Sequence, residues 1–152
     1  MKTVFSSIID DRDGYIVWED TKHIAFLTPF PNTPGLTVVI PKQNIGDYIF
    51  SLDSKEYIQL LVATKKVAAL LQIALEAPRV ALVFEGTGVP HVHAKLYPLH
   101  GDKASKTNVW SDHIEYSDVY RKYLTTVEGP RMSDERLKEI QQKIIAANHH
   151  ID

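Results

Sequence analysis

The chain has 152 residues, of which 44% are hydrophobic and 24% are charged, and its formal net charge is -2. This composition is typical of a soluble globular protein, and the length suits one domain with its own core, so we expect a single domain over residues 1–152. The slightly negative charge argues against extended binding to nucleic acid. The absence of cysteine excludes disulfides, thiolate nucleophiles and cysteine-bound zinc.

The sequence predicts neither a targeting segment nor a membrane partner. Residues 1–10 lack the long apolar run and the small-residue cleavage site of a signal peptide. No segment is expected to supply the roughly 20 apolar residues that cross a bilayer. We therefore expect a cytoplasmic protein.

In chain order, the first third of the sequence alternates short β-rich runs with turns. A proline-rich loop at 29–35 precedes the third run, and Pro41 is expected to end it. The predicted strands lie at 15–18, 23–27 and 36–40.

A long amphipathic helix follows. Asp53 is its expected N-cap, Glu56 completes a capping box, and Pro78 is expected to end the helix. Its apolar stripe consists of Tyr57, Leu60, Leu61, Val67, Leu70, Leu71, Ala74 and Leu75.

Two further strands are predicted at 79–84 and 91–97, and a glycine-rich turn joins them. A last helix begins after Ser133 and carries Leu137, Ile140, Ile144 and Ile145 on one face. Five strands grouped around one long helix indicate an α+β fold with a largely antiparallel sheet.

The run His91-Val92-His93-Ala94-Lys95 is the most informative part of the sequence. In an extended strand alternate side chains share one face, so His91, His93 and Lys95 are expected to form a row. Two imidazoles and an ammonium suit an anionic substrate, and one imidazole can act as nucleophile or base. A solvated strand face is the alternative, but the preceding glycine-rich turn favours a site. Backbone N–H groups of Gly86, Thr87 and Gly88 could form a nest for a phosphate.

This motif resembles that of the histidine triad (HIT) superfamily, with lysine in place of the third histidine. The resemblance includes residues 25–27, 31–42 and 85–91, and it covers roughly residues 4–101. It implies a five-stranded antiparallel sheet with one long helix, in a core of about 4–101 followed by a C-terminal helical extension over 102–152. Members usually form homodimers, so the resemblance also implies a homodimer.

The family consists mainly of nucleotidyl hydrolases and transferases that act at the α-phosphate of a nucleotide. The resemblance implies that His93 attacks phosphorus and forms a covalent nucleotidyl-histidine. It implies that His91 shapes the site and orients His93, partly through its backbone. The turn from Gly86 to Gly88 would approach the phosphate.

Three departures from the family pattern bear on function. Lys95 can hold a phosphate oxygen but is a poor proton shuttle near neutral pH. Thr28 stands where many members have an aspartate that binds the ribose hydroxyls. No metal site is expected, because Thr3, Ser6 and Asn44 occupy places where some bacterial members have zinc ligands.

Two loop residues complete the candidate site. His100 could approach as a substitute proton donor, although a loop histidine is more often solvated. Asn32 could present its amide to the substrate, although a turn-forming role is at least as probable on general grounds.

The leading hypothesis is a cofactor-independent nucleotidyl hydrolase with a nucleotide conjugate as substrate. Lys95 keeps a nucleotidyltransferase or phosphorylase open as a second hypothesis. Thr28 and Lys95 together keep open a third hypothesis, a nucleotide- or phosphate-binding protein with weak or no catalysis.

Overall fold

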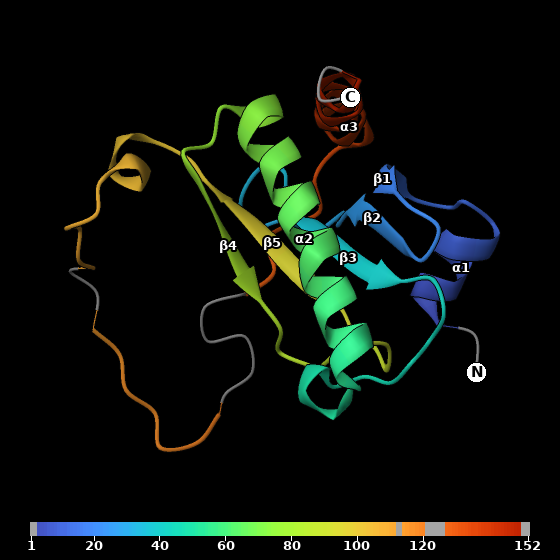
Figure 1. Ribbon diagram of the computed structural model, residues 1–152. Coiled ribbons are helices and arrows are strands. Elements are labelled where there is room, and N and C mark those ends of the chain that lie inside the picture. The colour runs from blue at the N-terminus through green and yellow to red at the C-terminus, as the bar shows by residue number, and fades with distance from the viewer. Residues whose placement is uncertain (1–2, 112–113, 121–126, 150–152) are drawn as a thin grey trace.

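The computed structural model describes residues 3–111, 114–120 and 127–149, and its centre is a five-stranded antiparallel sheet (Figure 1). The strand order across the sheet is β1-β2-β3-β5-β4. The strands are β1 Tyr15–Glu19, β2 His23–Leu27, β3 Thr37–Pro41, β4 Arg79–Val83 and β5 Ala94–Leu99. The helices are α1 Val4–Asp10, α2 Ser54–Leu75 and α3 Asp134–Asn148, with short 3-10 turns at Ile49–Ser51 and Asp102–Ser105. The predicted α+β fold is confirmed.

The two faces of the sheet have different neighbours. The helix α2 crosses one face, where its residues Leu60, Val67 and Leu71 are buried against strand residues such as Val39 and Leu96 (Figure 1). On the opposite face, α1 packs against a smaller apolar cluster. This second cluster consists of Phe5, Ile8, Ile24, Phe26, Val38 and Ile40. Alternation along the strands therefore separates a thick core from a thinner layer.

The C-terminal helix shares the main core. Leu137, Ile140 and Ile144 are at most 2% exposed and belong to the same cluster as the inner residues of α2. Ser133 caps α3 as predicted, by accepting a hydrogen bond from the backbone N–H of Arg136 at 3.3 Å. Within the described residues, α3 thus shares one core with α2 and the sheet, and a single domain over residues 1–152 stays a prediction.

The helix α1 was not predicted, and local hydrogen bonds explain why it forms. Thr3 and Ser6 make a capping box, in which each side chain lies 3.2 Å from the backbone nitrogen of the other residue. Phe5 and Ile8, three residues apart, are buried on one side of the helix.

Several predicted boundaries differ from the structure, and the backbone explains two of the differences. The strand β5 begins at Ala94 rather than at residue 91, because the backbone N–H of Val92 donates to the carbonyl of Gly46 at 2.6 Å instead of joining the ladder. The helix α2 ends at Leu75, before Pro78, because Glu76 adopts a left-handed conformation with φ 52°.

The expectation about membrane spans also needs correction. The helix α2 has 22 residues and is long and apolar enough, by length and composition alone, to cross a membrane. The core helix of a soluble protein passes the same test, and α2 buries Leu60, Val67 and Leu71 against the sheet. A cytoplasmic location stays a prediction.

Candidate functional site

A pocket of about 910 Å³ lies on the face of the sheet opposite α2. Phe26, Val38 and Lys95 line it from three neighbouring strands, and the pairing of Phe26 with Val38 and of Val38 with Lys95 places them in one row. Phe5 and Ile8 of α1 also line the pocket. The volume lies within the range of small-molecule sites.

His93 lies in this pocket and is only 4% exposed. Its Nδ1 is 2.8 Å from the backbone carbonyl oxygen of His91. A carbonyl oxygen can only accept, so Nδ1–H donates this bond. The neutral ring therefore carries its lone pair on Nε2, which is the form required of a nucleophile or base.

Burial lowers the pKa of His93 below its ordinary value. The hydrogen bond to the His91 carbonyl opposes this effect, whereas the nearby charge of Lys95 lowers the pKa further. The imidazole is thus held in its neutral form to lower pH than a solvated histidine.

His91 is 2% exposed and does not line the pocket. Its Nε2–H donates to the carbonyl oxygen of Pro41 at 2.7 Å, at the end of β3. Burial lowers its pKa too, with the Pro41 bond acting in the opposite direction. His91 therefore presents its backbone carbonyl to His93, and its role in orienting His93 stays a prediction.

Phe5 packs against both histidines. Its ring centroid is 5.4 Å from that of His93 and 5.7 Å from that of His91, in edge-on arrangements. Sequence reasoning missed this residue because it missed α1. The spacing of Phe5, Ile8 and Ile9 after a Thr3–Ser6 cap was the available signal.

Lys95 follows His93 on the same side of the chain and lines the pocket. Its Nζ is 4.0 Å from Oε2 of Glu85, and both side chains are largely buried. An acidic partner thus accompanies the lysine that stands in the place of a third histidine. Glu85 was not among the predicted site residues.

The glycine-rich turn contributes two of its three predicted residues to the pocket. Thr87 and Gly88 line it, whereas Gly86 does not. A β-carbon added at Gly86 would lie 3.3 Å from Cδ2 of Tyr48. Gly86 and Gly88 have φ values of 72° and 95°, which favour glycine. The Thr87 hydroxyl is buried and has no hydrogen-bond partner within the described residues.

The other predicted residues divide into one in the pocket and two outside it. Thr28 lines the pocket, and its hydroxyl accepts a hydrogen bond from the Phe30 N–H at 3.2 Å. His100 lies outside, because its Nε2 is 2.8 Å from the carbonyl of Pro34. Asn32 is exposed and also lies outside the pocket lining.

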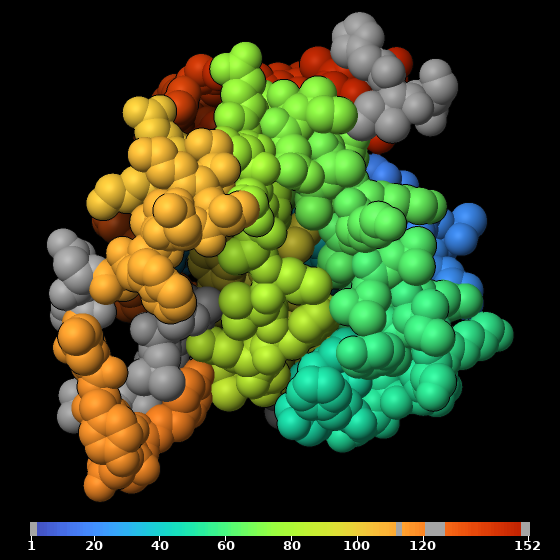
Figure 2. Space-filling model, turned by 60° about the vertical axis from the view of Figure 1, so that its left-hand side comes forward, coloured from blue at the N-terminus to red at the C-terminus, as the bar shows by residue number. Residues whose placement is uncertain are grey.

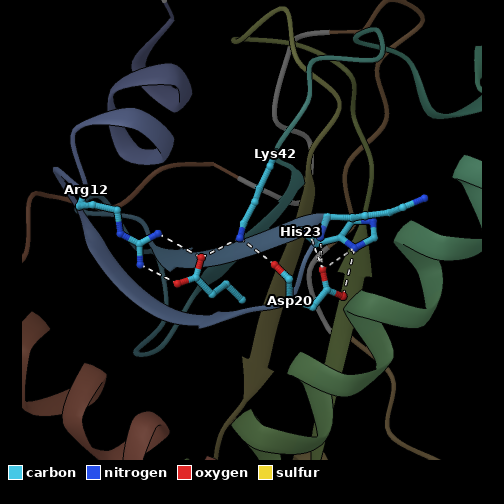
Figure 3. Close-up of polar contacts among 6 residues, drawn as sticks. Arg12, Asp20, His23 and Lys42 are labelled. Carbon is cyan, nitrogen blue, oxygen red and sulfur yellow. Dashed lines mark hydrogen bonds and ion pairs between the residues drawn. The ribbon is translucent and has the colours of Figure 1, made fainter.

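Two arginines that were not predicted lie at the far rim of the pocket. Arg12 is held by both carboxylate oxygens of Glu19, at 2.7 and 3.1 Å, and Glu19 also pairs with Lys42 (Figure 3). These bonds hold the pKa of Glu19 at about 2. Arg131 is held by Asp134 at 2.8 Å.

The three residues that stand where some bacterial HIT proteins have zinc ligands make structural hydrogen bonds here. Thr3 and Ser6 cap α1, and the Asn44 amide donates to the Pro90 carbonyl at 2.9 Å. Within the described residues, no group of three or more histidine, aspartate or glutamate side chains could hold a metal ion.

The chemistry that the arranged residues can perform is nucleophilic attack by His93 on a group held near Lys95.

Comparisons with known proteins agree with this fold. An uncharacterised HIT-like protein of Saccharolobus solfataricus is 28% identical over 132 residues, which cover 82% of this chain and 91% of that protein. An uncharacterised HIT-like protein of Mycoplasma genitalium is 31% identical over 117 residues, which cover 69% of this chain and 82% of that protein. A hypothetical histidine triad nucleotide-binding protein from Sulfolobus tokodaii has a similar structure, with a TM-score of 0.75 at 24% identity over 98% of this chain and 93% of that one. A zinc-bound histidine triad family protein from Mycobacterium smegmatis gives a TM-score of 0.73 at 21% identity over 100% of this chain and 96% of that one. The HIT domain model matches residues 11–101, more than half of the sequence, and the chain therefore belongs to the HIT domain family.

Proposed function

We propose that this protein is a nucleotidyl hydrolase that acts at the α-phosphate of a nucleotide conjugate through a covalent intermediate on His93. The observation that carries the proposal is the bond from Nδ1–H of His93 to the His91 carbonyl. It leaves Nε2 as the nucleophile, in a pocket of a size suited to a nucleotide.

The reaction has two steps. In the first, Nε2 of His93 forms a bond to the α-phosphorus, and the bond from phosphorus to the leaving group breaks. The leaving group departs with its electron pair and takes up a proton. In the second, water attacks phosphorus, the N–P bond breaks, and the nucleotide is released with His93 regenerated.

The residues around His93 suggest how the substrate is held. Lys95 and the turn at Thr87 and Gly88 supply positive charge and backbone N–H groups for the phosphate. Phe5 and Phe26 supply apolar surface for the base. The proposal requires no cofactor.

Replacement of His93 by alanine is expected to abolish turnover of dinucleoside polyphosphates and adenosine phosphoramidates, because the nucleophile is lost. The native protein is expected to yield a nucleotidyl-protein adduct on rapid quenching with alkali, which preserves an N–P bond to histidine, and intact mass spectrometry at alkaline pH detects it. His149→Ala changes the exposed histidine at the C-cap of α3 and serves as the control, with activity unchanged. Turnover retained by His93→Ala would overturn the proposed mechanism.

Replacement of Lys95 by glutamine is expected to change the pH profile of the first step. The positive charge of Lys95 lowers the pKa of His93, so its removal raises that pKa. The acid limb of kcat/KM, which reports protonation of the free nucleophile, then moves to higher pH. Steady-state kinetics over a pH series measures this shift, with exposed Lys138→Gln as the control. An acid limb that stays at the same pH, or that moves to lower pH, would contradict this role of Lys95.

A nucleotidyltransferase or phosphorylase is the second candidate, and the pairing of Lys95 with Glu85 favours it. An ammonium group, with an ordinary pKa near 10.4, is a poor proton shuttle for the water that resolves the intermediate. On this alternative, an anionic acceptor such as inorganic phosphate attacks in place of water.

Nucleotide release measured with and without inorganic phosphate separates the two candidates. The hydrolase is expected to give the same rate and the same nucleotide product under both conditions. A transferase is expected to release nucleotide several-fold faster with phosphate and to yield the phosphorylated nucleotide. Full turnover in water alone would exclude the second candidate.

We further propose a homodimer formed along α2 and the edge strand β4, which adjoin on one face of the molecule (Figure 2). Ile58, Val62 and Ile73 of α2 are 57%, 48% and 58% exposed, and Leu82 of β4 is 41% exposed. An exposed apolar surface beside an edge strand is typical of a protein interface.

Light scattering is expected to give twice the mass of 17.2 kDa for the native chain. Val62→Asp places a charge on the proposed interface and is expected to give monomers at micromolar concentration. Val4→Asp, at a residue 61% exposed on α1, is the matched control and is expected to stay dimeric. A monomeric native chain would overturn the dimer.

A further inference from the structure

Glu85 lies beside the two side chains that the proposed reaction uses. Val83 ends β4 and pairs with Lys95 of β5, and Glu85 follows Val83 by two residues, so it reaches the same side of the sheet as Lys95. Oε2 of Glu85 is 4.0 Å from Nζ of Lys95, and the side chains are only 12% and 14% exposed. Burial lowers the pKa of His93, the charge of Lys95 lowers it further, and the charge of Glu85 raises it. Glu85 is therefore close enough to both residues to set the charge of this end of the pocket.

The end of the pocket at His93 has one ammonium and one carboxylate beside it, and their formal charges cancel. The neutral donors there are the backbone N–H groups of the glycine-rich turn and the buried hydroxyl of Thr87, which has no hydrogen-bond partner within the described residues. The other charged residues of the described pocket lining are Arg12, Asp13, Glu128 and Arg131. They belong to segments 12–13 and 128–131, next to β1, which β2 and β3 separate from β5.

The two negative charges that a phosphate group can carry are not equally favourable at this end. A first charge pairs with the ammonium of Lys95, and the neutral donors at Thr87 and Gly88 bind the phosphate oxygens. A second charge meets an ammonium that Glu85 already offsets, so its attraction to Lys95 and its repulsion from Glu85 nearly cancel. The cost of removing the second charge from water is then left without compensation.

We propose that Glu85 offsets the charge of Lys95 and thereby restricts this end of the pocket to a singly charged phosphate. The inference rests on the proposed function, because it places the α-phosphate beside Lys95. The preferred substrates are conjugates whose α-phosphate has one ionised oxygen, as in phosphodiesters and phosphoanhydrides.

The same restriction affects the product and the acceptor. A nucleotide with a free 5′-phosphate is doubly charged above a pH of about 6, so the product of hydrolysis binds weakly and Glu85 favours its release. On the transferase alternative, an acceptor phosphate would likewise bind in its singly charged form.

Two nucleotides that differ in the charge of the phosphate test the proposal. The probes are AMP and its 5′-phosphate methyl ester, titrated into the full chain by calorimetry at pH 8, where AMP has two phosphate charges and the ester has one. The native protein is expected to bind the ester about 10-fold or more tightly than AMP. Glu85→Gln is expected to strengthen AMP binding by about 10-fold, to strengthen ester binding less, and to remove most of the preference. The methyl group contributes equally in both proteins, so the change in the ratio of the two dissociation constants reports the charge.

Lys95→Gln is the reciprocal variant and is expected to weaken AMP binding more than ester binding, because Glu85 then repels both charges of AMP. Glu135→Gln is the matched control, since Glu135 is an exposed glutamate of α3 outside the pocket lining, and the native ratio is expected.

The outcomes separate this proposal from the proposed function. A native protein that binds AMP as tightly as the ester, or a ratio that Glu85→Gln leaves unchanged, would overturn the role of Glu85 while leaving the proposed function standing. Equal weakening of both nucleotides by Glu85→Gln would show a purely structural role and would overturn it as well. Failure of the native protein to bind either nucleotide would overturn both proposals.

Discussion

The site depends on two buried imidazoles, each of which donates a hydrogen bond to a backbone carbonyl. His93 donates to His91, and His91 donates to Pro41. A buried N–H without a partner would be costly, so these two bonds permit both rings to be nearly fully buried. They also fix the tautomer of His93, because its Nδ1 must carry the proton. A surface histidine would reorient freely, so neither its tautomer nor the direction of its Nε2 lone pair would be fixed.

The sheet sets the distances on which this chain of bonds depends. Pro41 ends β3, and His91 and His93 lie just before β5, whose Ala94 pairs with Val39. The antiparallel pairing of β3 with β5 therefore brings the Pro41 carbonyl to His91. The ring of Phe5 packs against both imidazoles from α1. Changes in strand register would separate these groups, since a slip of one residue reverses the face of each side chain.

Sequence reasoning could predict the features that repeat with a short period. The alternation around His93 and the apolar stripe of α2 each depend on neighbouring residues, and the α+β fold with five strands followed from them. The short helix α1 was missed because its seven residues give little periodic signal and its burial depends on strands far along the chain. The rim residue Arg131 could not be predicted, because Asp134 connects it to Tyr15 across 119 residues.

Loop residues were the weakest part of the predicted site, for a physical reason. Short polar side chains in loops often bond to nearby backbone groups, as Thr28 does to Phe30. His100 bonds instead to the carbonyl of Pro34, 66 residues away. Composition and spacing indicate that such residues are available for binding, but the backbone conformation decides which partner they take.

Lys95 affects the two halves of the proposed reaction in opposite ways. Its charge lowers the pKa of His93 and attracts a phosphate, so it favours the neutral nucleophile and the bound substrate together. A third imidazole would lower the pKa of His93 less and attract a phosphate less, because imidazole is mostly neutral at pH 7. The second half requires a group that exchanges protons near neutral pH, and an ammonium beside Glu85 is poorly suited to that task. The lysine therefore favours formation of the intermediate over its hydrolysis, and the chemistry of the acceptor decides how the intermediate is resolved.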